Sequence, residues 1–175
     1  MVVEKIVIER EIVQKIYEHC LKALRERPRK AFGLLFGQKQ GDTWVVKSLV
    51  NDLRDASEEF RLENVFEEYG WPDCDCPRED FGFAIRPEDV KRACEEAEQY
   101  GWRLLAVYHL HPCSHRRDQS PAIPSKVDRV LALPSVLMII VHATQQEGIK
   151  SLRAFRILDD AEKSAQEISI EIKEK

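Results

Sequence analysis

The spacing of apolar residues along the chain follows two different rhythms, and each rhythm predicts a kind of secondary structure. In some stretches apolar residues alternate with polar ones or form short unbroken runs, which is typical of strands in a sheet. In others they recur every third or fourth position, which is typical of helices that bury one face. Strands are expected over residues 5–9, 31–38, 43–50, 104–110, 136–142 and 152–158. Helices are expected over residues 12–24, 87–100 and 125–133.

Strands and helices therefore succeed one another along the whole chain, with no internal repeat and no linker between them. Residues 51–80 are acidic and irregular, and they are the least predictable part of the sequence. The end of the chain should add an edge strand, because isoleucines alternate there with polar residues, at Ile168, Ile170 and Ile172. The expected fold class is a single α/β domain over residues 1–175, with a mixed central sheet flanked by helices.

The composition excludes several classes of protein. Of the 175 residues, 43% are hydrophobic, which suffices for a sizeable core, and 33% are charged, which exceeds the usual quarter. The net charge of −4 gives no basic field for nucleic acid, and no apolar stretch is long enough to cross a membrane. Five cysteines, an odd number, argue against a secreted disulfide framework. We therefore expect a cytoplasmic protein, and the sequence leaves its oligomeric state open.

The most informative chemical pattern is a pair of histidines at the end of the expected strand 104–110. Successive side chains of a strand alternate between its faces, so Val107, His109 and His111 should share one face. Two imidazoles placed in this way lie close enough to bind one metal ion. Asp128, near the start of the next expected helix, can provide a third ligand. A solvent-derived fourth ligand would complete the tetrahedron of a catalytic zinc site.

Each half of this pattern also has a simpler interpretation. A histidine at a strand end is more often a hydrogen-bonded polar group than a metal ligand. Ser125 and Asp128, three residues apart, form a helix N-cap signature in which the serine oxygen accepts a backbone N–H and the acidic group complements the helix dipole. The presence of both halves in one chain, joined by a proline-rich loop, favours the metal site.

The order of these residues resembles the JAMM/MPN+ (Mov34/MPN/PAD-1) family of zinc metalloproteases, in its bacterial and archaeal form. The family pattern is His-x-His-Pro, a loop, and then Pro-Ser-x-x-Asp. Here it stands as His109-Leu110-His111-Pro112, followed by Pro124-Ser125-Lys126-Val127-Asp128. Residues 28–37 are similar to the family's first core strand, and residues 83–87 to a strand that leads into a helix. The resemblance thus covers most of the chain.

The resemblance implies a fold and an activity. The fold would be a single MPN-like domain of the cytidine-deaminase-like class. The activity would be that of a zinc-dependent metallopeptidase or isopeptidase acting at the C-terminal tail of a ubiquitin-like or small sulfur-carrier protein. In such an enzyme His109, His111 and Asp128 would bind Zn²⁺, and Ser125 would help to stabilise the oxyanion of the tetrahedral intermediate.

The chain departs from the family pattern at Lys30. The resemblance places the catalytic glutamate, which takes a proton from zinc-bound water, at this position, three residues before Gly33. A cationic lysine cannot accept that proton, and loss of a general base typically lowers the rate by about 10²–10⁴. Three explanations stay open. Lys30 can point to solvent while Glu26, Asp80 or Asp118 replaces the base; its neutral amine can act as the base if burial lowers its pKa; or the domain is a catalytically inactive MPN-type binding or scaffold module.

Two apparent insertions carry further residues that bind soft metals. One insertion lies at about 61–80, and the other, at about 112–120, lengthens the loop after the second histidine. Each contains two such residues, two positions apart: Cys74 and Cys76 in the first, Cys113 and His115 in the second. The hypothesis is that these four residues form a second, structural Cys₃His zinc site that joins the insertions. Free thiols or a single Cys–Cys bridge are the alternatives.

Overall fold

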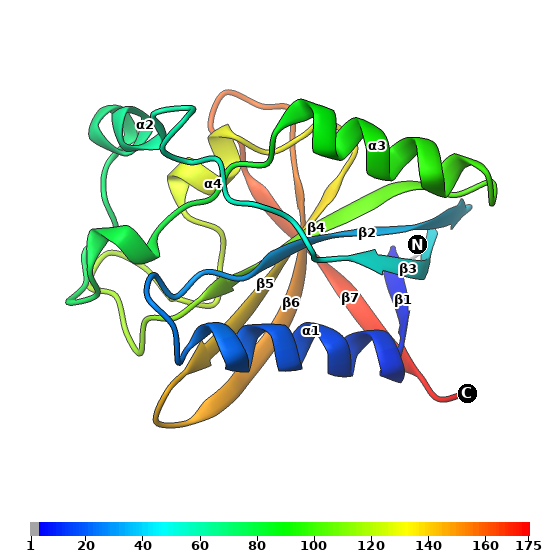
Figure 1. The fold of residues 1–175 in the computed structure, drawn as a ribbon, viewed down its shortest axis with the longest axis horizontal. Helices are drawn as coiled ribbons and strands as arrows, with labels where there is room; N and C mark the ends of the chain where they lie inside the picture. Colours follow the sequence, from blue (N-terminus) through cyan, green and yellow to red (C-terminus); the bar gives the residue numbers. More distant parts are fainter. Residues whose placement is uncertain (1–3) are drawn as a thin grey trace.

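A computed structural model describes residues 4–175, and residues 1–3 of the expected domain lie outside this part. Within it, one sheet closes on itself in the strand order β1-β3-β2-β4-β5-β6-β7 (Figure 1). The strands are β1 Lys5–Glu9, β2 Phe32–Gln40, β3 Thr43–Val50, β4 Arg103–His111, β5 Leu137–Thr144, β6 Gly148–Ile157 and β7 Ala165–Lys173. The helices are α1 Arg10–Ala23, α2 Leu62–Tyr69, α3 Pro87–Glu98 and α4 Lys126–Val130, with a short 3-10 helix at Arg78–Asp80.

The closure of the sheet corrects one part of the expected fold. The sheet is mixed, as expected, because β4 runs parallel to β5 and β1 runs parallel to both β3 and β7, while the remaining pairs are antiparallel. The last strand, however, is not an edge strand: β7 pairs with β6 on one side and with β1 on the other. Alternation along a sequence indicates which face of a strand is buried, but it does not indicate the neighbours of that strand.

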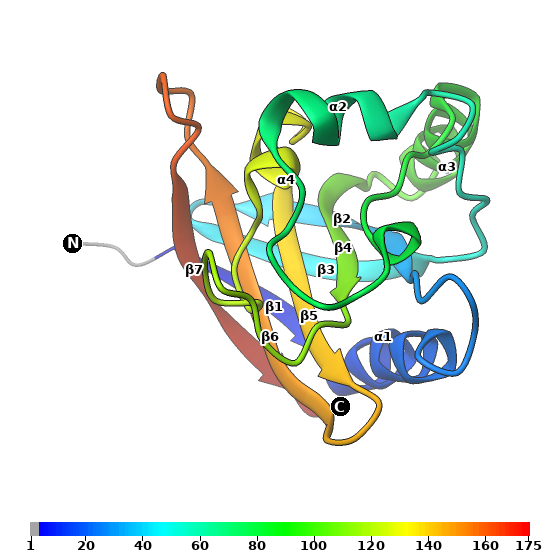
Figure 2. The same cartoon turned by 90° about the vertical axis from the view of Figure 1, so that its left-hand side faces the viewer.

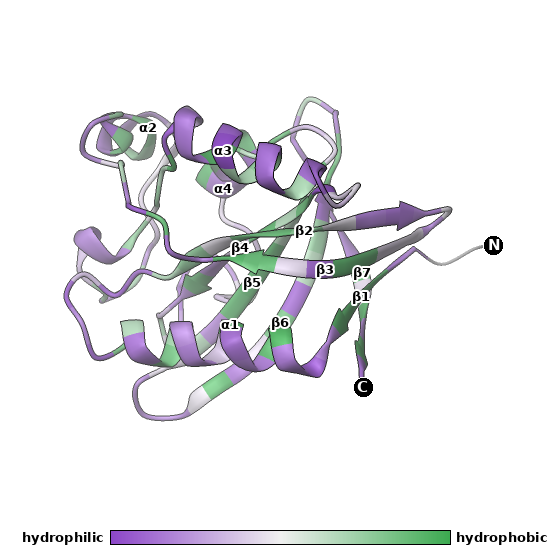
Figure 3. Cartoon of the chain, turned by 45° about the vertical axis from the view of Figure 1, so that its right-hand side comes forward, coloured by the Kyte–Doolittle hydropathy of each residue, from purple (hydrophilic) through white to green (hydrophobic). Residues whose placement is uncertain are grey.

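Two long helices cover opposite faces of the central strands β2 and β4. Figure 1 shows α1 along one side of these strands and α3 along the other. The apolar stripe of α1 enters the main core, where its members include Ile12, Val13, Ile16 and Cys20. The stripe of α3 is narrower and packs Ala93 and Ala97 against Leu34 and Phe36. Hydrophilic and hydrophobic bands alternate along α1, as an amphipathic helix requires (Figure 3). None of the helices within residues 4–175 has the length and apolar character needed to cross a membrane.

The insertion at 61–80 contains a helix that the sequence pattern did not predict. Helix α2 buries Leu62 and Phe66, which pack with Val127 of α4. Figure 2 shows these two short helices next to each other at one end of the sheet. Helix α4 itself is shorter than the expected 125–133. The insertion thus provides an apolar cover for the element that carries Asp128.

Strand β2 contains two glycines that let its neighbours approach closely, β4 at Gly33 and β3 at Gly37. A Cβ atom added at Gly33 would lie 2.4 Å from the ring of Tyr108, and one added at Gly37 would lie 2.0 Å from the carbonyl oxygen of Val45. No side chain can occupy either position without movement of the neighbouring strand or ring. Gly33 therefore allows the start of β2 to lie close to the end of β4.

Candidate metal centre

Strand β4 carries the two histidines and determines where they lie. It pairs with β2 on one side and with β5 on the other, so its direction and register are fixed. Tyr108 packs in the core with α1, whereas Val107 packs in the cluster with α3. Because side chains alternate along a strand, His109 and His111 lie on the same face as Val107. The structure places the two imidazoles side by side, with their Nε2 atoms 2.9 Å apart.

Helix α4 brings Asp128 to that face, and Ser125 caps the helix. The Oγ of Ser125 accepts the backbone N–H of Asp128 at 3.1 Å, and Oδ2 of Asp128 accepts the backbone N–H of Ser125 at 2.8 Å. This reciprocal capping box holds the carboxylate in one orientation, and such a cap contributes about 1 kcal/mol to stability. The N-cap and metal-ligand interpretations are therefore compatible, because one carboxylate caps the helix and also faces the histidines.

The three side chains converge with the spacing of metal ligands. The Nε2 atoms of His109 and His111 lie 2.9 Å apart, and each lies 3.2 Å from a different oxygen of Asp128. Ligand atoms bound at about 2.0–2.1 Å to a tetrahedral zinc ion would lie about 3.3 Å from one another. The side chain of His109 is only 7% exposed and that of Asp128 12%. Two imidazoles and one carboxylate with this spacing fit a zinc ion.

The hydrogen bond of His111 fixes which of its nitrogens faces the cluster. Its Nδ1 lies 2.7 Å from the carbonyl oxygen of Pro121, which can only accept, so Nδ1 donates a proton to it. Neutral His111 therefore presents the lone pair of Nε2 to the cluster. A backbone carbonyl that orients a metal-binding imidazole in this way is a common feature of protein metal sites.

The electrostatics of the cluster keep Asp128 ionised. Burial by itself would raise the pKa of this carboxyl group, but the adjacent imidazoles of His109 and His111 hold the pKa well below its usual range. An ionised carboxylate between two imidazoles is the form that binds a divalent cation.

Lys30 does not point to solvent, contrary to one of the explanations offered for it. Its Nζ donates to Oδ2 of Asp55 at 3.0 Å and to Oγ of Ser57 at 3.2 Å, and its side chain is 13% exposed. Burial raises the pKa of Asp55, but its bonds to Ser57, Lys30 and the Ala84 amide lower the pKa overall. Lys30 is thus an ion-paired cation, and no proton acceptor occupies the position of the family's glutamate.

Of the three carboxylates considered as a replacement base, Asp80 alone lines the metal pocket, which it shares with His109 and His111. Glu26 is exposed beyond the end of α1, and Asp118 pairs with Arg116 in the loop after β4. Asp80 is 3% exposed. Its position at the end of the insertion brings a buried carboxylate beside the candidate zinc ligands.

Arg29 holds Asp80 in place, and no sequence pattern indicated this role. The backbone N–H of Arg29 donates to Oδ1 of Asp80 and the Nε of Arg29 donates to Oδ2, each at 2.8 Å. The two residues are 51 positions apart, and Arg29 belongs to a short basic run that resembles an ordinary solvated helix end. Only the folded chain shows that this arginine fixes a carboxylate in the pocket.

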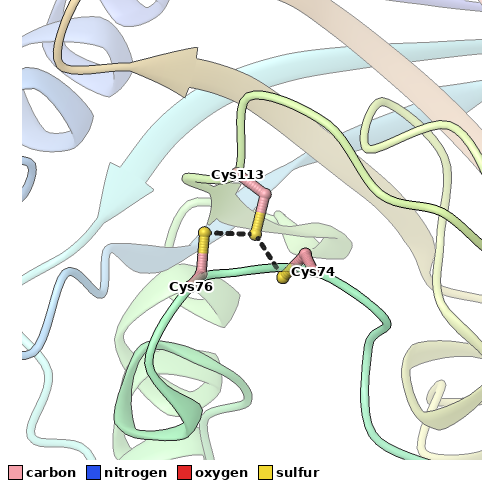
Figure 4. A group of neighbouring side chains, drawn as sticks. All are labelled: Cys74, Cys76 and Cys113. Carbon is pink, nitrogen blue, oxygen red and sulfur yellow. Dashed lines mark hydrogen bonds between the residues drawn. The ribbon is translucent and has the colours of Figure 1, made fainter.

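The structure brings together three of the four residues expected in the second metal site. The sulfur of Cys113 lies 3.0 Å from that of Cys74 and 2.7 Å from that of Cys76 (Figure 4). His115 is not part of this cluster; it is exposed, and its Nδ1 lies 3.3 Å from the hydroxyl of Ser114. The chain turns after Cys113 in an exposed loop. The side chains of Cys113 and His115, two positions apart, therefore do not point in the same direction.

His142 supports the loop between the two clusters. Its Nε2 donates to the carbonyl oxygen of Cys113 at 2.7 Å. Burial lowers the pKa of this imidazole, while the bond to the Cys113 carbonyl opposes the change. His142 is therefore a structural residue that holds the backbone just after β4.

Comparisons with known proteins agree with the sequence resemblance. Residues 9–157 match the profile of the family described as prokaryotic homologs of the JAB domain. The solution structure of protein DSY2949 from Desulfitobacterium hafniense is similar, with a TM-score of 0.65 and 22% identity over 97% of this chain and 94% of that one. The solution structure of a protein from Salinibacter ruber has a TM-score of 0.58 and 19% identity over 98% and 92% of the respective chains. No curated protein matches the chain.

Proposed function

The chain belongs to the family of prokaryotic homologs of the JAB domain, and from this premise we propose that it is a zinc-dependent peptidase or isopeptidase. The observation that carries the proposal is the buried convergence of His109, His111 and Asp128, whose ligand atoms lie 2.9–3.2 Å apart. A zinc ion held by these residues supplies a Lewis acid and a nucleophile at neutral pH.

Asp80 is the proposed general base. It is the carboxylate that lines the pocket beside the two histidines without belonging to the ligand set. A carboxylate has about four lone-pair sites, and Arg29 occupies only part of them. A remaining lone pair can take a proton from the attacking water and later deliver it to the leaving amine. On this proposal the insertion at 61–80 provides the carboxylate base that is missing at the position of Lys30.

Ser125 is the proposed oxyanion-stabilising residue. Its oxygen already accepts the N–H of Asp128, so its hydroxyl hydrogen is free to donate. The hydroxyl lines the same pocket as His109 and Asp80. A donor fixed in advance by a helix cap loses little entropy when charge develops on the substrate carbonyl oxygen.

The proposed substrate is the C-terminal tail of a ubiquitin-like or sulfur-carrier protein, as the family resemblance suggests. Aromatic and proline side chains line the pocket, and they include Phe66, Pro72, Phe81, Pro112 and Pro121. A slim extended peptide with small residues fits a pocket lined in this way better than a folded surface or a bulky side chain does. This preference supports a tail rather than an internal loop as the substrate.

The direct test is hydrolysis of a ubiquitin-like protein fused through its Gly-Gly tail to a reporter peptide, with zinc added. We expect turnover by the natural chain, and loss of turnover with loss of one zinc ion in His109→Ala. Cys94→Ser, which lies on α3 outside both clusters, serves as a matched control and should retain full activity. Turnover that persists unchanged in His109→Ala would refute the proposed enzyme.

A second candidate function is a binding module without catalysis, and the ion pair of Lys30 with Asp55 favours it. Under this proposal the domain holds a ubiquitin-like tail in the same pocket but does not cleave it. Tail binding by calorimetry, with no turnover by the natural chain and a gain of turnover in Lys30→Glu, would support the module over the enzyme. Failure of the zinc-loaded natural chain to bind the tail would exclude the module.

A further inference from the structure

The cluster of Cys74, Cys76 and Cys113 shares no ligand with the His109, His111 and Asp128 set, although Cys113 lines the same pocket, and it is formed by two separate segments. Cys74 and Cys76 belong to the segment that follows α2, and Cys113 follows the end of β4. In Figure 4 the sulfur of Cys113 lies between the other two and points toward both. Cys113 thus lies 39 positions along the chain from Cys74 and 37 positions from Cys76.

A set of polar contacts fixes the orientation of the two cysteines in the first loop. The backbone N–H of Arg117 donates to the carbonyl oxygen of Asp73 at 2.8 Å. The guanidinium group of Arg117 donates to the carboxylates of Asp73 and Asp75, at 3.0 and 2.7 Å. The aspartates therefore face Arg117, while the alternate residues Cys74 and Cys76 face Cys113. The contacts of Arg117 with the two aspartates therefore direct the sulfurs of Cys74 and Cys76 toward that of Cys113.

The alternatives to a metal leave part of this cluster unexplained. A disulfide uses two sulfurs and leaves the third cysteine outside the bond, although the sulfur of Cys113 lies close to both of the others, at 3.0 and 2.7 Å. Hydrogen bonds between thiols are weak and provide little reason to gather three of them in one place. A single soft cation uses all three as ligands, and thiolates select ions such as zinc.

The geometry requires only a small adjustment to accept zinc. Sulfurs bound at about 2.3 Å to a tetrahedral zinc ion lie about 3.8 Å apart. The observed separations of 2.7 and 3.0 Å are shorter, so each pair would move apart by about 1 Å or less to admit the ion. Cys74 and Cys76 are only partly buried, and the largely exposed segment that carries them can shift more readily than the buried Cys113.

A positive charge lies beside the cluster. The guanidinium group of Arg29 pairs with Asp80 and lies close enough to Cys76 for its charge to act on that thiol. A zinc ion with three thiolate ligands carries a net charge of −1, and a partly buried negative centre needs a nearby cation. Arg29 provides that cation and also links the cluster to the carboxylate in the catalytic pocket.

We propose that Cys74, Cys76 and Cys113 bind a second zinc ion, which fastens the segment after α2 to the loop after β4. Binding releases three thiol protons to solvent, and the fourth coordination position is open to water. His115 is not a ligand. The proposal is independent of the proposed function, because none of the three cysteines belongs to the His109, His111 and Asp128 set.

The test is the zinc content of the reduced full-length chain after expression with zinc, measured by mass spectrometry of the metal. We expect two zinc ions per chain in the natural protein, and one in Cys76→Ser and in Cys113→Ser. Cys94→Ser and His115→Ala should retain both ions. The same zinc content in the natural chain and in both cluster variants would overturn the proposal, and loss of an ion in His115→Ala would overturn the three-thiolate ligand set.

A second measurement keeps the test decisive if a cysteine variant folds poorly. In His109→Ala, which removes a ligand of the catalytic site only, the X-ray absorption spectrum at the zinc edge should show three sulfur neighbours at about 2.3 Å. Zinc with nitrogen and oxygen neighbours alone would overturn the proposal. A Cys74–Cys113 or Cys76–Cys113 disulfide found by peptide mass spectrometry in the freshly prepared, unreduced protein would also overturn it.

Discussion

Lys30 and Asp55 form an ion pair at the place where the family pattern has its catalytic glutamate, with Nζ 3.0 Å from Oδ2. Asp55 also accepts the backbone N–H groups of Ser57 and Ala84. This carboxylate therefore connects the residue before β2 with the segment before α2 and the segment before α3. The lysine is therefore part of the architecture around the pocket. This relationship determines what restoring the glutamate would do.

We expect Lys30→Glu to destabilise the protein by about 1–3 kcal/mol, because it places a second carboxylate against Asp55 and removes the donor of a partly buried group. We also expect no gain in turnover. Urea unfolding measures the first effect, with Lys30→Met as the variant that removes the charge without adding repulsion. Equal stability of Lys30→Glu and the natural chain would contradict this account.

Asp80→Asn should lower kcat by about 10²–10⁴ while the zinc content stays unchanged, because the amide cannot accept a proton from water. Asp118→Asn, a change of the same size in the loop after β4, is the control and should keep its rate. Activity is measured on the reporter fusion and normalised to bound zinc. If Asp80→Asn retains the full rate, another residue is the base.

Ser125→Ala should have two separable effects. Loss of the helix cap should lower the free energy of unfolding by about 1 kcal/mol. Loss of the proposed oxyanion donor should lower kcat by about 10²–10³. Ser125→Thr, which keeps a hydroxyl at the cap, should recover much of both, and Ser120→Ala should change neither. A loss of stability without any loss of kcat would restrict Ser125 to its capping role.

His142 predicts a dependence of stability on pH. Burial lowers its pKa in the folded protein below the unfolded value of about 6.5. Between these two pKa values the unfolded chain binds more protons, so stability rises with pH in this window. The contribution is fully present above about pH 6.5 and is lost as the pH falls through the lowered pKa.

His142→Gln tests this prediction because glutamine can donate to the Cys113 carbonyl but does not titrate. The free energy of unfolding of the natural chain should fall more steeply than that of His142→Gln as the pH decreases from 7 to 5. Parallel curves for the two proteins would show that His142 makes no such contribution.

The sequence by itself predicted the candidate ligand set of His109, His111 and Asp128 and most of the elements. His109 and His111 share a face because alternation is a local property of a strand, and Ser125 and Asp128 lie together because a capping box is a local property of a helix start. Such features depend on neighbours within a few residues. They can therefore be predicted from spacing alone.

The tertiary structure decided everything that joins distant segments. Closure of the sheet through β7 and β1, the contact of Arg29 with Asp80, and the partner of Lys30 each link residues far apart in the chain. The position of His115 could not be predicted from spacing either. An irregular loop has no fixed period, so residues two positions apart need not lie on the same side of it. Local patterns specify which way a side chain points from its own element, and only packing of the whole chain specifies what that side chain meets.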